Sequence, residues 1–596
     1  MKENKESKGT QFEEEKILLT EDQVKDQTEI KEETEKDDMV ENGVHNYSTE
    51  ESYVWPTDPA VRKKLEWFRD QKLGLMMHWG AYSQLGIVES WALSDADACW
   101  SRHCIDWEVT GEEFKKQYFD LNKTFNPIRF EPEKWADIAK AAGTKYLLFT
   151  TKHHDGFCMW DTKYSDYKIT AEDCPYHTNH YADICAHLFE SFRKRDLGVI
   201  AYFSKADWHV DSYWSENYER GSYQHRGPSY DPKEYPEEWE RFVNFTQNQI
   251  MELGSRYGQI DGMWFDAGWV CKENGQDIRL GEVIERVRKF QPGMLCADRT
   301  IGGPYENYVT PEQCVPEEPL MIPWESCITL GTSFSFVYED TYKSPREVIC
   351  LLVDIVVKGG NLAINVGPQP NGCLPKGAVD CLLGMGQWLD VYGEAIYGTR
   401  VCAPYKKDGI GFTTKNGVVY AIETFATETE KVPSKVWIPY EGKVTEITEL
   451  SGGGALSFEA KEGGYLVNVG KWKEEKAPIG RVFCLKMRKE EIPMAQLQDK
   501  SKMPYQDAAL PVKERVEDLL SRMTLREKVG QLNQRLYGFH AYERHGDEIT
   551  LTEETISEAE YFGGLGVVYG LYRADPWSAK TKENGLTSEY AARCYN

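Results

Sequence analysis

The residues best suited to catalysis or ligand binding are histidines, acidic residues and aromatic residues that come directly after short apolar runs. They lie in five segments: His78-Trp79-Gly80, Lys152-His153-His154-Asp155-Gly156-Phe157, Tyr202-Phe203-Ser204, Trp264-Phe265-Asp266 and Asp298-Arg299. A single histidine or aspartate at such a place is readily explained as a satisfied structural residue or a helix cap. The same arrangement after five separate runs indicates that these side chains share one site.

Two kinds of reaction use residues of these types. A metal-dependent hydrolase would take His78, His153, His154 and Asp266 as ligands, but no His-x-His pair follows the first apolar run and the sequence has no His-Glu-x-x-His motif. A glycosidase instead needs a carboxylate nucleophile, a second carboxyl group as acid and base, and aromatic surfaces with hydrogen-bond donors for a sugar. The sequence offers all of these groups, so it favours glycoside hydrolysis without a metal or an organic cofactor.

The candidate nucleophile is Asp266, which ends the run Asp261-Gly-Met-Trp-Phe-Asp266. Two later glutamates, Glu312 and Glu325, are predicted to lie on loops that reach the same site, and spacing alone does not choose between them as the acid and base. A lectin-like protein that binds a sugar without cleaving it is a further interpretation. The presence of the nucleophile candidate and of both candidate acids argues against it.

The apolar runs before these groups are predicted to be parallel strands buried on both faces. They are Leu73–His78, Tyr146–Thr151, Leu197–Tyr202, Ile260–Phe265, Met294–Ala297 and Asn361–Asn365. Amphipathic stretches separate them; Glu131–Ala142, for example, is predicted to be a helix that ends at Gly143. The predicted fold class is α/β, with an eight-fold (β/α)8-like barrel, because no G-x-G-x-x-G motif follows the first strand. The carboxyl ends of barrel strands meet at one mouth, where the five segments would then lie.

Composition divides the chain into five parts. Residues 1–52 are acidic and poor in aromatics and are predicted to form a disordered tail, 53–400 the barrel, 401–490 an all-β sandwich, 491–503 a charged linker, and 504–596 a helical and strand-like segment. Two helices are predicted within 512–532 and one strand-like run at 563–569. About ninety residues with these elements cannot close a core of this kind. We therefore interpret the last part as an incomplete α/β domain.

Charge and composition exclude several classes of protein. The 596 residues include 70 Lys and Arg against 97 Asp and Glu, a net charge of −27 without a basic run, so nucleic acid is not an expected partner. Neither a membrane span nor a signal peptide is predicted, because no long apolar stretch occurs and the residues after Met1 are charged. The 15 scattered cysteines favour reduced thiols and a cytoplasmic location.

Four sequence blocks occur in order along the chain, namely Leu73-Gly-Leu-Met-Met-His-Trp-Gly80, Thr151-Lys-His-His-Asp-Gly-Phe157, Asp261-Gly-Met-Trp-Phe-Asp266 and Lys358-Gly-Gly-Asn-Leu-Ala-Ile-Asn-Val-Gly-Pro368. Together they resemble the signature blocks of the α-L-fucosidases, glycoside hydrolase family 29. The resemblance extends from about Tyr53 to Lys489. It implies a catalytic barrel followed by a β-sandwich, and a retaining exo-acting hydrolase that releases terminal α-L-fucose through a covalent fucosyl-enzyme intermediate. The implied partner is a fucosylated oligosaccharide or glycoconjugate, and a homo-oligomer is compatible with the sequence.

Carried over by position, the resemblance implies a role for each candidate residue. Asp266 matches the nucleophile, and Glu312 is preferred over Glu325 as acid and base because it lies at the family's usual distance from Arg299. The implied fucose-binding residues are His78, His153, His154, Tyr202, Trp264 and Arg299, with Trp324 shaping the pocket beside Glu325.

One loop departs from the family pattern. The family commonly has Glu-Trp after the first strand, whereas this chain has Val88-Glu89-Ser90-Trp91. We expect Glu89 to bind sugar hydroxyls after a local shift, with Trp91 beside it. An apolar wall must also receive the C5 methyl group of fucose, for which Phe334, Phe336 and Trp324 are the candidates.

The C-terminal segment has a different resemblance. Residues 505–532 and the run Arg573-Ala-Asp-Pro-Trp577 are similar to the start of glycoside hydrolase family 3, the β-glucosidase and β-xylosidase barrels. In that family the catalytic residues come later in the sequence, so this resemblance assigns no site residue within the chain. It predicts a fucosidase joined to the truncated start of a β-glycosidase.

Overall fold

The computed structural model describes residues 47–487 apart from 95–96, 103–108, 110, 219–225 and 453, together with shorter stretches between 513 and 585. The predicted tail up to residue 46, the predicted linker and most of the two helices predicted within 512–532 lie outside the described residues. The chain separates into two compact units, Met1–Arg488 and Lys489–Asn596.

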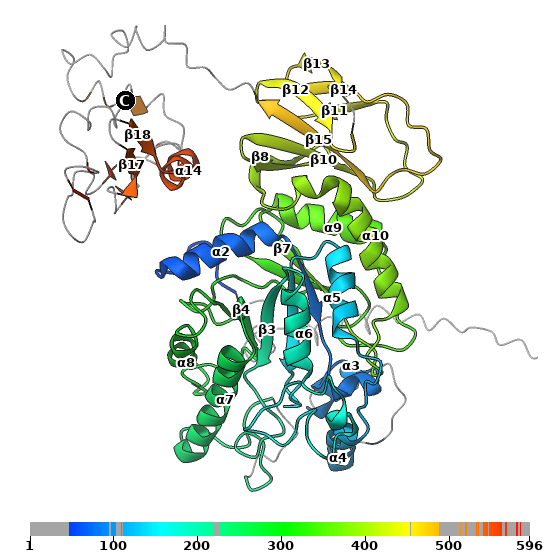
Figure 1. The fold of residues 1–596 in the computed structure, drawn as a ribbon, viewed down its shortest axis with the longest axis vertical. Helices are drawn as coiled ribbons and strands as arrows, with labels where there is room; N and C mark the ends of the chain where they lie inside the picture. Colours follow the sequence, from blue (N-terminus) through cyan, green and yellow to red (C-terminus); the bar gives the residue numbers. More distant parts are fainter. Residues whose placement is uncertain are drawn as a thin grey trace, which may run out of the picture. The chain divides into compact units, whose positions relative to one another are not determined.

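A curled parallel sheet forms the centre of the first unit (Figure 1). Its strands run in the order β5-β4-β3-β2-β1-β7-β6. They are β1 (Leu73–Met77), β2 (Tyr146–Lys152), β3 (Gly198–Ser204), β4 (Gly262–Asp266), β5 (Leu295–Asp298), β6 (Glu325–Thr329) and β7 (Asn361–Val366). The predicted barrel-like α/β architecture is confirmed, but the described sheet has seven strands rather than eight, and β6 was not predicted.

The sheet is not closed between β5 and β6 by a regular strand. The chain between them forms isolated parallel bridges, Val309 with Trp324 and Glu312 with Cys327. These bridges lie where a further strand would pair with β6. The segment that carries Glu312 therefore continues the wall of the barrel beside β6.

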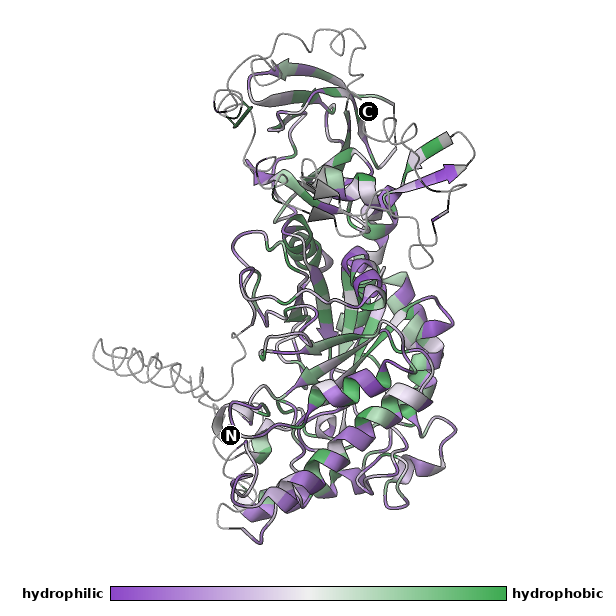
Figure 2. Cartoon of the chain, turned by 90° about the vertical axis from the view of Figure 1, so that its left-hand side faces the viewer, coloured by the Kyte–Doolittle hydropathy of each residue, from purple (hydrophilic) through white to green (hydrophobic). Residues whose placement is uncertain are grey.

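Helices lie around the sheet, and most of them cover its outer face (Figures 1 and 2). They are α2 (Pro59–Gln71), α3 (Ala98–Ser101), α4 (Gly111–Phe119), α5 (Pro132–Ala141), α6 (Ile184–Arg193), α7 (Pro236–Arg256), α8 (Leu280–Val287), α9 (Pro345–Val357) and α10 (Lys376–Tyr392), with short 3-10 turns at Ala81–Gln84, Trp91–Leu93, Asp120–Lys123, Pro175–Thr178 and Gly393–Ala395. The predicted helix 131–142 is α5. Local sequence sets the helix starts: Ser344 and Glu347 form a reciprocal capping box at the start of α9, with Pro345 in its first turn.

Alternation along the strands separates two apolar layers. In β3, Ile200 and Tyr202 pack inside the barrel, whereas Val199, Ala201 and Phe203 join the cluster under the helices. Helix α2 closes the amino end of the barrel, because its Phe68 stacks on Tyr308 with ring centroids 4.2 Å apart. The open end, where the strands terminate, is therefore the carboxyl end.

The first unit continues into two antiparallel sheets after Thr399. One has the order β12-β15-β10-β9-β8 and the other β11-β14-β13. Their strands are β8 (Arg400–Lys407), β9 (Ile410–Lys415), β10 (Val418–Thr424), β11 (Lys435–Ile438), β12 (Val444–Glu449), β13 (Ser457–Lys461), β14 (Gly464–Asn468) and β15 (Gly480–Met487). The β domain contacts the barrel through α9, whose Arg346 guanidinium donates to the backbone oxygens of Phe425, Ala477 and Pro478.

Residues 47–52 contact the barrel, which differs from the prediction of a solvated tail through residue 52. The amide of Ser48 donates to a carboxylate oxygen of Glu306 at 3.2 Å. The side chain of Tyr53 follows directly and donates to the backbone oxygen of Asn307 at 2.5 Å. The chain is therefore already part of the folded unit at these residues.

The second unit contains the short parallel pair β16 (Gln534–Arg535) and β19 (Val567–Val568), the hairpin β17 (Tyr542–His545) and β18 (Glu548–Leu551), and helix α14 (Glu553–Phe562). β19 lies within the strand-like run predicted at 563–569. Among the described residues of both units, no helix combines the length and the apolar character that a membrane crossing requires.

Candidate active site

The predicted chemical groups meet at the carboxyl end of the sheet. Asp266 is the last residue of β4, the three histidines follow β1 and β2, and Arg299 follows β5. Parallel strands that end at one edge bring such residues together, although they are up to 221 positions apart in the sequence. Asp266, His78, His153 and Arg299 line a pocket of about 280 Å³, whereas His154 is fully buried beside Asp266. The wall of the pocket also includes Tyr202, Trp264, Glu89, Trp91 and Glu312.

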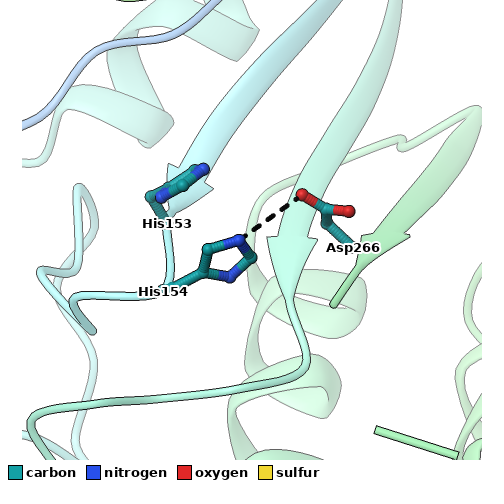
Figure 3. Close-up of side chains that lie close together, drawn as sticks. All are labelled: His153, His154 and Asp266. Carbon is teal, nitrogen blue, oxygen red and sulfur yellow. Dashed lines mark ion pairs between the residues drawn. The ribbon is translucent and has the colours of Figure 1, made fainter. Parts of the chain in front are cut away.

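The carboxylate of Asp266 is held from several sides. The Tyr202 hydroxyl donates to Oδ2 at 2.6 Å, and Arg299 Nη1 donates to Oδ1 at 3.0 Å. His154 Nε2 lies 3.7 Å from Oδ2 (Figure 3). Burial alone would raise the pKa of Asp266, but the charge of Arg299, together with His154 and Tyr202, outweighs burial and holds this pKa well below its usual range. Asp266 is therefore ionised and fixed in orientation, as a nucleophile must be.

Arg299 links Asp266 to Glu312. Its Nη2 contacts a carboxylate oxygen of Glu312 while its Nη1 holds Asp266. The guanidinium also lies over the ring of Trp264, 4.5 Å from the centroid. Burial by itself lowers the pKa of Arg299, but Glu312 and Asp266 more than reverse this effect and raise it. One permanently charged side chain thus keeps the two carboxyl groups as close neighbours.

The histidines are oriented by hydrogen bonds to their Nδ1 atoms. His78 Nδ1 lies 2.8 Å from Asn365 Oδ1, and the side-chain amide of Asn365 donates to Phe334 O at 2.6 Å, which fixes the Asn365 orientation. His78 therefore carries its proton on Nδ1 and keeps Nε2 as an acceptor. Burial lowers the pKa of His78 to about 4, so the ring is neutral at pH 7.

The tautomer of His154 is fixed in the same way, by a hydrogen bond to Nδ1. Its Nδ1 lies 2.7 Å from Ser204 Oγ, and the Ser204 hydroxyl itself donates to the backbone oxygen of Ala206. His154 must therefore donate from Nδ1, which leaves Nε2 as an acceptor with no hydrogen-bond partner in the described structure. Burial lowers its pKa to about 4. Asp266 Oδ2 and His154 Nε2 are then two acceptors 3.7 Å apart.

The loop after β1 brings both of its predicted residues into the pocket. Glu89 is buried and accepts from the backbone amide of Ser335 at 2.7 Å, and burial raises its pKa to about 8, with Glu312 and Asp266 adding to the shift. The Trp91 ring lies 4.7 Å from the ring of His154. Ser90, the residue inserted between them, contacts His153 Nδ1 at 2.5 Å. The departure from Glu-Trp thus supplies a residue that orients a histidine.

Trp324 and Glu325 lie elsewhere, which corrects the expectation that they reach the mouth. Glu325 begins β6, where it pairs with Asn361 at the start of β7, so both residues lie at the amino end of the barrel. The Tyr146 hydroxyl donates to Glu325, and burial raises the pKa of Glu325 to about 7. Trp324 packs over Gly360. The sequence did not reveal that a strand starts here, so the direction of these side chains was misjudged.

The pocket also contains residues that sequence reasoning missed. They form an apolar corner with Phe334, namely Met76 and Cys327, and an outer wall, namely Asp97, Trp100, Arg226, Gly268, Trp269 and Thr300. Phe334 had been a candidate for a methyl-binding wall, whereas Phe336 is buried outside the pocket lining. Met76 could have been inferred as an inward position of the first predicted strand, whereas Cys327 lies on β6, which was not predicted. Nothing in the sequence connects Asp97 with Arg226.

A metal ion is geometrically conceivable in one place. Ligand atoms of His153, His154 and Asp266 lie within 4.8 Å of one another (Figure 3). However, Arg299 already donates to Asp266, and its positive charge disfavours a cation beside the same carboxylate. The arrangement suits a sugar with several hydroxyl groups better than a metal.

Comparison with known proteins identifies the family. A family described as Alpha-L-fucosidase matches residues 40–394. The chain belongs to this family. It is 28% identical to the tissue alpha-L-fucosidase of Rattus norvegicus over 479 residues, which covers 75% of this chain and 93% of the rat protein. The family match ends before the segment similar to family 3, whose resemblance stays a prediction.

Solved fucosidase structures share the fold. Alpha-L-fucosidase isoenzyme 1 from Paenibacillus thiaminolyticus superimposes with a TM-score of 0.59 at 27% identity, covering 72% of this chain and 99% of that one. A family 29 alpha-L-fucosidase from Bacteroides thetaiotaomicron, described as a trapped covalent intermediate with 2-fluoro-fucosyl fluoride in a Glu-to-Gln mutant, gives a TM-score of 0.58 at 25% identity, covering 74% and 99%. The chain is accordingly a glycoside hydrolase of the α-L-fucosidase family.

Proposed function

We propose that this protein is a retaining exo-α-L-fucosidase in which Asp266 is the nucleophile and Glu312 the acid and base. The observation that carries the proposal is the arrangement of these two carboxyl groups on the two terminal nitrogens of Arg299. Retaining glycosidases need their two carboxyl groups only about 5–5.5 Å apart, whereas inverting enzymes leave room for a water molecule between them. Two groups held by one guanidinium favour the closer arrangement.

The reaction then proceeds in two balanced steps. In the first, Asp266 forms a bond to C1 of the fucose as the glycosidic bond breaks, and Glu312 gives its proton to the departing oxygen. In the second, Glu312 takes a proton from a water molecule, whose oxygen attacks C1. The bond between C1 and Asp266 breaks, and fucose leaves with its original anomeric configuration. Arg299 and Tyr202 hold the Asp266 carboxylate during both steps.

The lining of the pocket accounts for fucose as the sugar. Neutral His78 lines the pocket and presents an acceptor nitrogen to hydroxyl groups, and the ring of Trp264 forms part of the pocket wall. Met76, Cys327 and Phe334 form an apolar corner that suits the C5 methyl group. We infer that the substrate is a fucosylated oligosaccharide or glycoconjugate that presents terminal α-L-fucose.

Glu89 is the alternative acid. It lines the same pocket, and its pKa of about 8 would keep it protonated at neutral pH, as a general acid requires. Its carboxyl group already accepts from the amide of Ser335, which ties it to the wall. We therefore assign Glu89 to binding a sugar hydroxyl and keep its catalytic role as an outcome of the tests.

The first test is turnover of para-nitrophenyl α-L-fucoside in buffer that contains EDTA, with proton NMR to identify the first-formed anomer. We expect release of α-L-fucose by the full chain and loss of turnover in Asp266→Asn, while fucose binding is retained. The matched control is Asp137→Asn, an exposed carboxylate of α5. Binding without turnover in the wild type would support a lectin, loss of activity with EDTA a metal hydrolase, and a β-anomer an inverting enzyme.

The cytoplasmic location expected from the composition stays a prediction. It rests on the scattered cysteines, and fractionation of the native host cell would test it.

A further inference from the structure

The outer wall of the pocket carries an exposed tryptophan in a fixed position. Trp100 lines the pocket although 41% of its surface is exposed. Its indole N–H donates to Asp97 Oδ1 at 3.1 Å. An aromatic ring that is both accessible and held at one edge is a preformed surface for an apolar ligand face.

An ion pair joins this tryptophan to the loop after β3. Arg226 donates to both carboxylate oxygens of Asp97, from Nε at 2.9 Å and from Nη2 at 2.6 Å. Asp97 is buried and Arg226 is largely buried, so solvent screens this pair much less than an exposed one. Trp100, Asp97 and Arg226 thus form one connected unit, although Asp97 and Arg226 are 129 residues apart.

The backbone of Arg226 is anchored as firmly as its side chain. Its carbonyl oxygen accepts from Trp208 Nε1 at 3.0 Å and from the Tyr213 hydroxyl at 3.2 Å. Its guanidinium lies 4.7 Å from the centroid of Trp91, which in turn contacts His154. The outer wall is therefore connected, contact by contact, to the residues around Asp266.

The position of this unit restricts what it can bind. The inner end of the pocket is closed by Met76 and Cys327, which lie on β1 and β6. In an exo-acting enzyme the cleaved sugar occupies the closed end, so the group attached to it must lie at the rim. The C–H face of a pyranose is apolar and its edge is polar, a combination that matches the exposed Trp100 ring beside the Asp97 and Arg226 pair.

We propose that Trp100, positioned by Asp97 and Arg226, is the surface on which the pyranose that carries the fucose packs. This inference rests on the proposed fucosidase function and specifies its substrate as a glycan in which fucose is linked to another sugar, rather than to a lipid or a peptide. Trp100 would contribute to specificity through the leaving group and not through the fucose ring.

The experiment compares two substrates that differ only on the leaving side. α-L-Fucosyl fluoride has no ring there, whereas the isomers of fucosyllactose present a galactose or glucose ring. For Trp100→Ala we expect kcat/KM to fall about tenfold on the fucosyllactose isomer that the wild type cleaves. The decrease in kcat/KM on the fluoride should be several-fold smaller. Trp100→Phe keeps a ring without the indole N–H, so it should recover most of the lost kcat/KM.

Controls separate this inference from the proposed function and from misfolding. Trp55→Ala removes another exposed tryptophan that does not line the pocket, and both kcat/KM values should stay at the wild-type level. Equal losses of Trp100→Ala on both substrates, or a wild type that hydrolyses the fluoride but no fucosyllactose isomer, would overturn the inference. A wild type that fails to hydrolyse the fluoride would instead refute the proposed function.

Discussion

Glu312 is the residue whose assignment has the most specific kinetic consequence. Only a poor leaving group needs protonation, so Glu312→Ala should lower kcat/KM on fucosyllactose by roughly a hundred- to ten-thousandfold and on para-nitrophenyl fucoside far less. Added azide should restore turnover of the aryl substrate and yield fucosyl azide, because the substitution leaves space beside the intermediate. The same pattern in Glu89→Ala, and its absence in Glu312→Ala, would transfer the acid role to Glu89.

The raised pKa of Glu89 predicts part of the pH profile. Above pH 8 its carboxyl group ionises and adds a negative charge beside Asp266 and Glu312, which hinders formation of the anionic leaving group. We expect kcat/KM on the aryl fucoside to fall as the pH rises through about 8, and Glu89→Gln to move this limb to higher pH. A limb unchanged in Glu89→Gln would show that another group controls it.

Residues of the site could be predicted where they follow a recognisable strand. His78, His153, His154, Asp266 and Arg299 do so, and the structure brings them together, with all but His154 in the lining of one pocket. Trp324 and Glu325 were misplaced because the polar start of β6, Glu-Ser-Cys, gives no strand pattern. The contact between Asp97 and Arg226 depends on two loops meeting in space, which spacing along the sequence does not encode.

At the scale of elements, the amino end of β6 contains a buried carboxyl group with no catalytic task. The pKa of Glu325 rises from 4.5 to about 7 on folding, which corresponds to about 3 kcal/mol. Because the folded state binds the proton more tightly, this contribution is fully present below pH 4.5 and is lost as the pH rises through 7. The barrel should therefore lose stability between these pH values.

Glu325→Gln tests this expectation. The amide stays neutral and still accepts from the Tyr146 hydroxyl, so the variant should have a higher Tm than the wild type at pH 8 and a similar Tm at pH 5. Fucosidase activity should be retained, since the residue lies at the opposite end of the barrel. Calorimetric scans at both pH values provide the measurement, and an equal Tm difference at both would contradict it.

The strands that the sequence revealed share one property. Six runs of four to six residues, almost wholly apolar, correspond to β1 to β5 and β7, because both faces of these strands are covered. In the β domain, β8 and β13 lack a clear sequence pattern. β13 is mostly exposed, and β8 alternates poorly, so neither shows the pattern of a half-buried strand.

At the scale of the whole molecule, the two units predict a simple truncation. A chain that ends at Arg488 keeps β15, which pairs with both β10 and β12, and so retains every strand of the first unit. We expect it to keep the fucosidase kcat/KM of the full chain and to be more soluble, because Val516, Leu519, Leu520 and Leu532 expose apolar side chains in the removed part.

A second truncation, after Ile479, serves as its control. It removes β15, which lies between β12 and β10 in the five-stranded sheet, and should yield insoluble protein. Activity lost in the chain that ends at Arg488 would show that the second unit supports the first. Activity assays with the purified truncated chains and size-exclusion chromatography decide between these outcomes.

The opening in the sheet between β5 and β6 has a consequence for how this enzyme can change. Asp266 belongs to a strand paired on both sides, so a shift of one residue there would disturb two ladders. Glu312 belongs to a segment attached by isolated bridges, and insertions nearby would leave every ladder intact. The proposed nucleophile is therefore fixed in register by two ladders, whereas the position of the proposed acid along the sequence is much less constrained. The segment from Thr300 to Pro323 is accordingly the natural cassette to exchange when a new leaving group is sought.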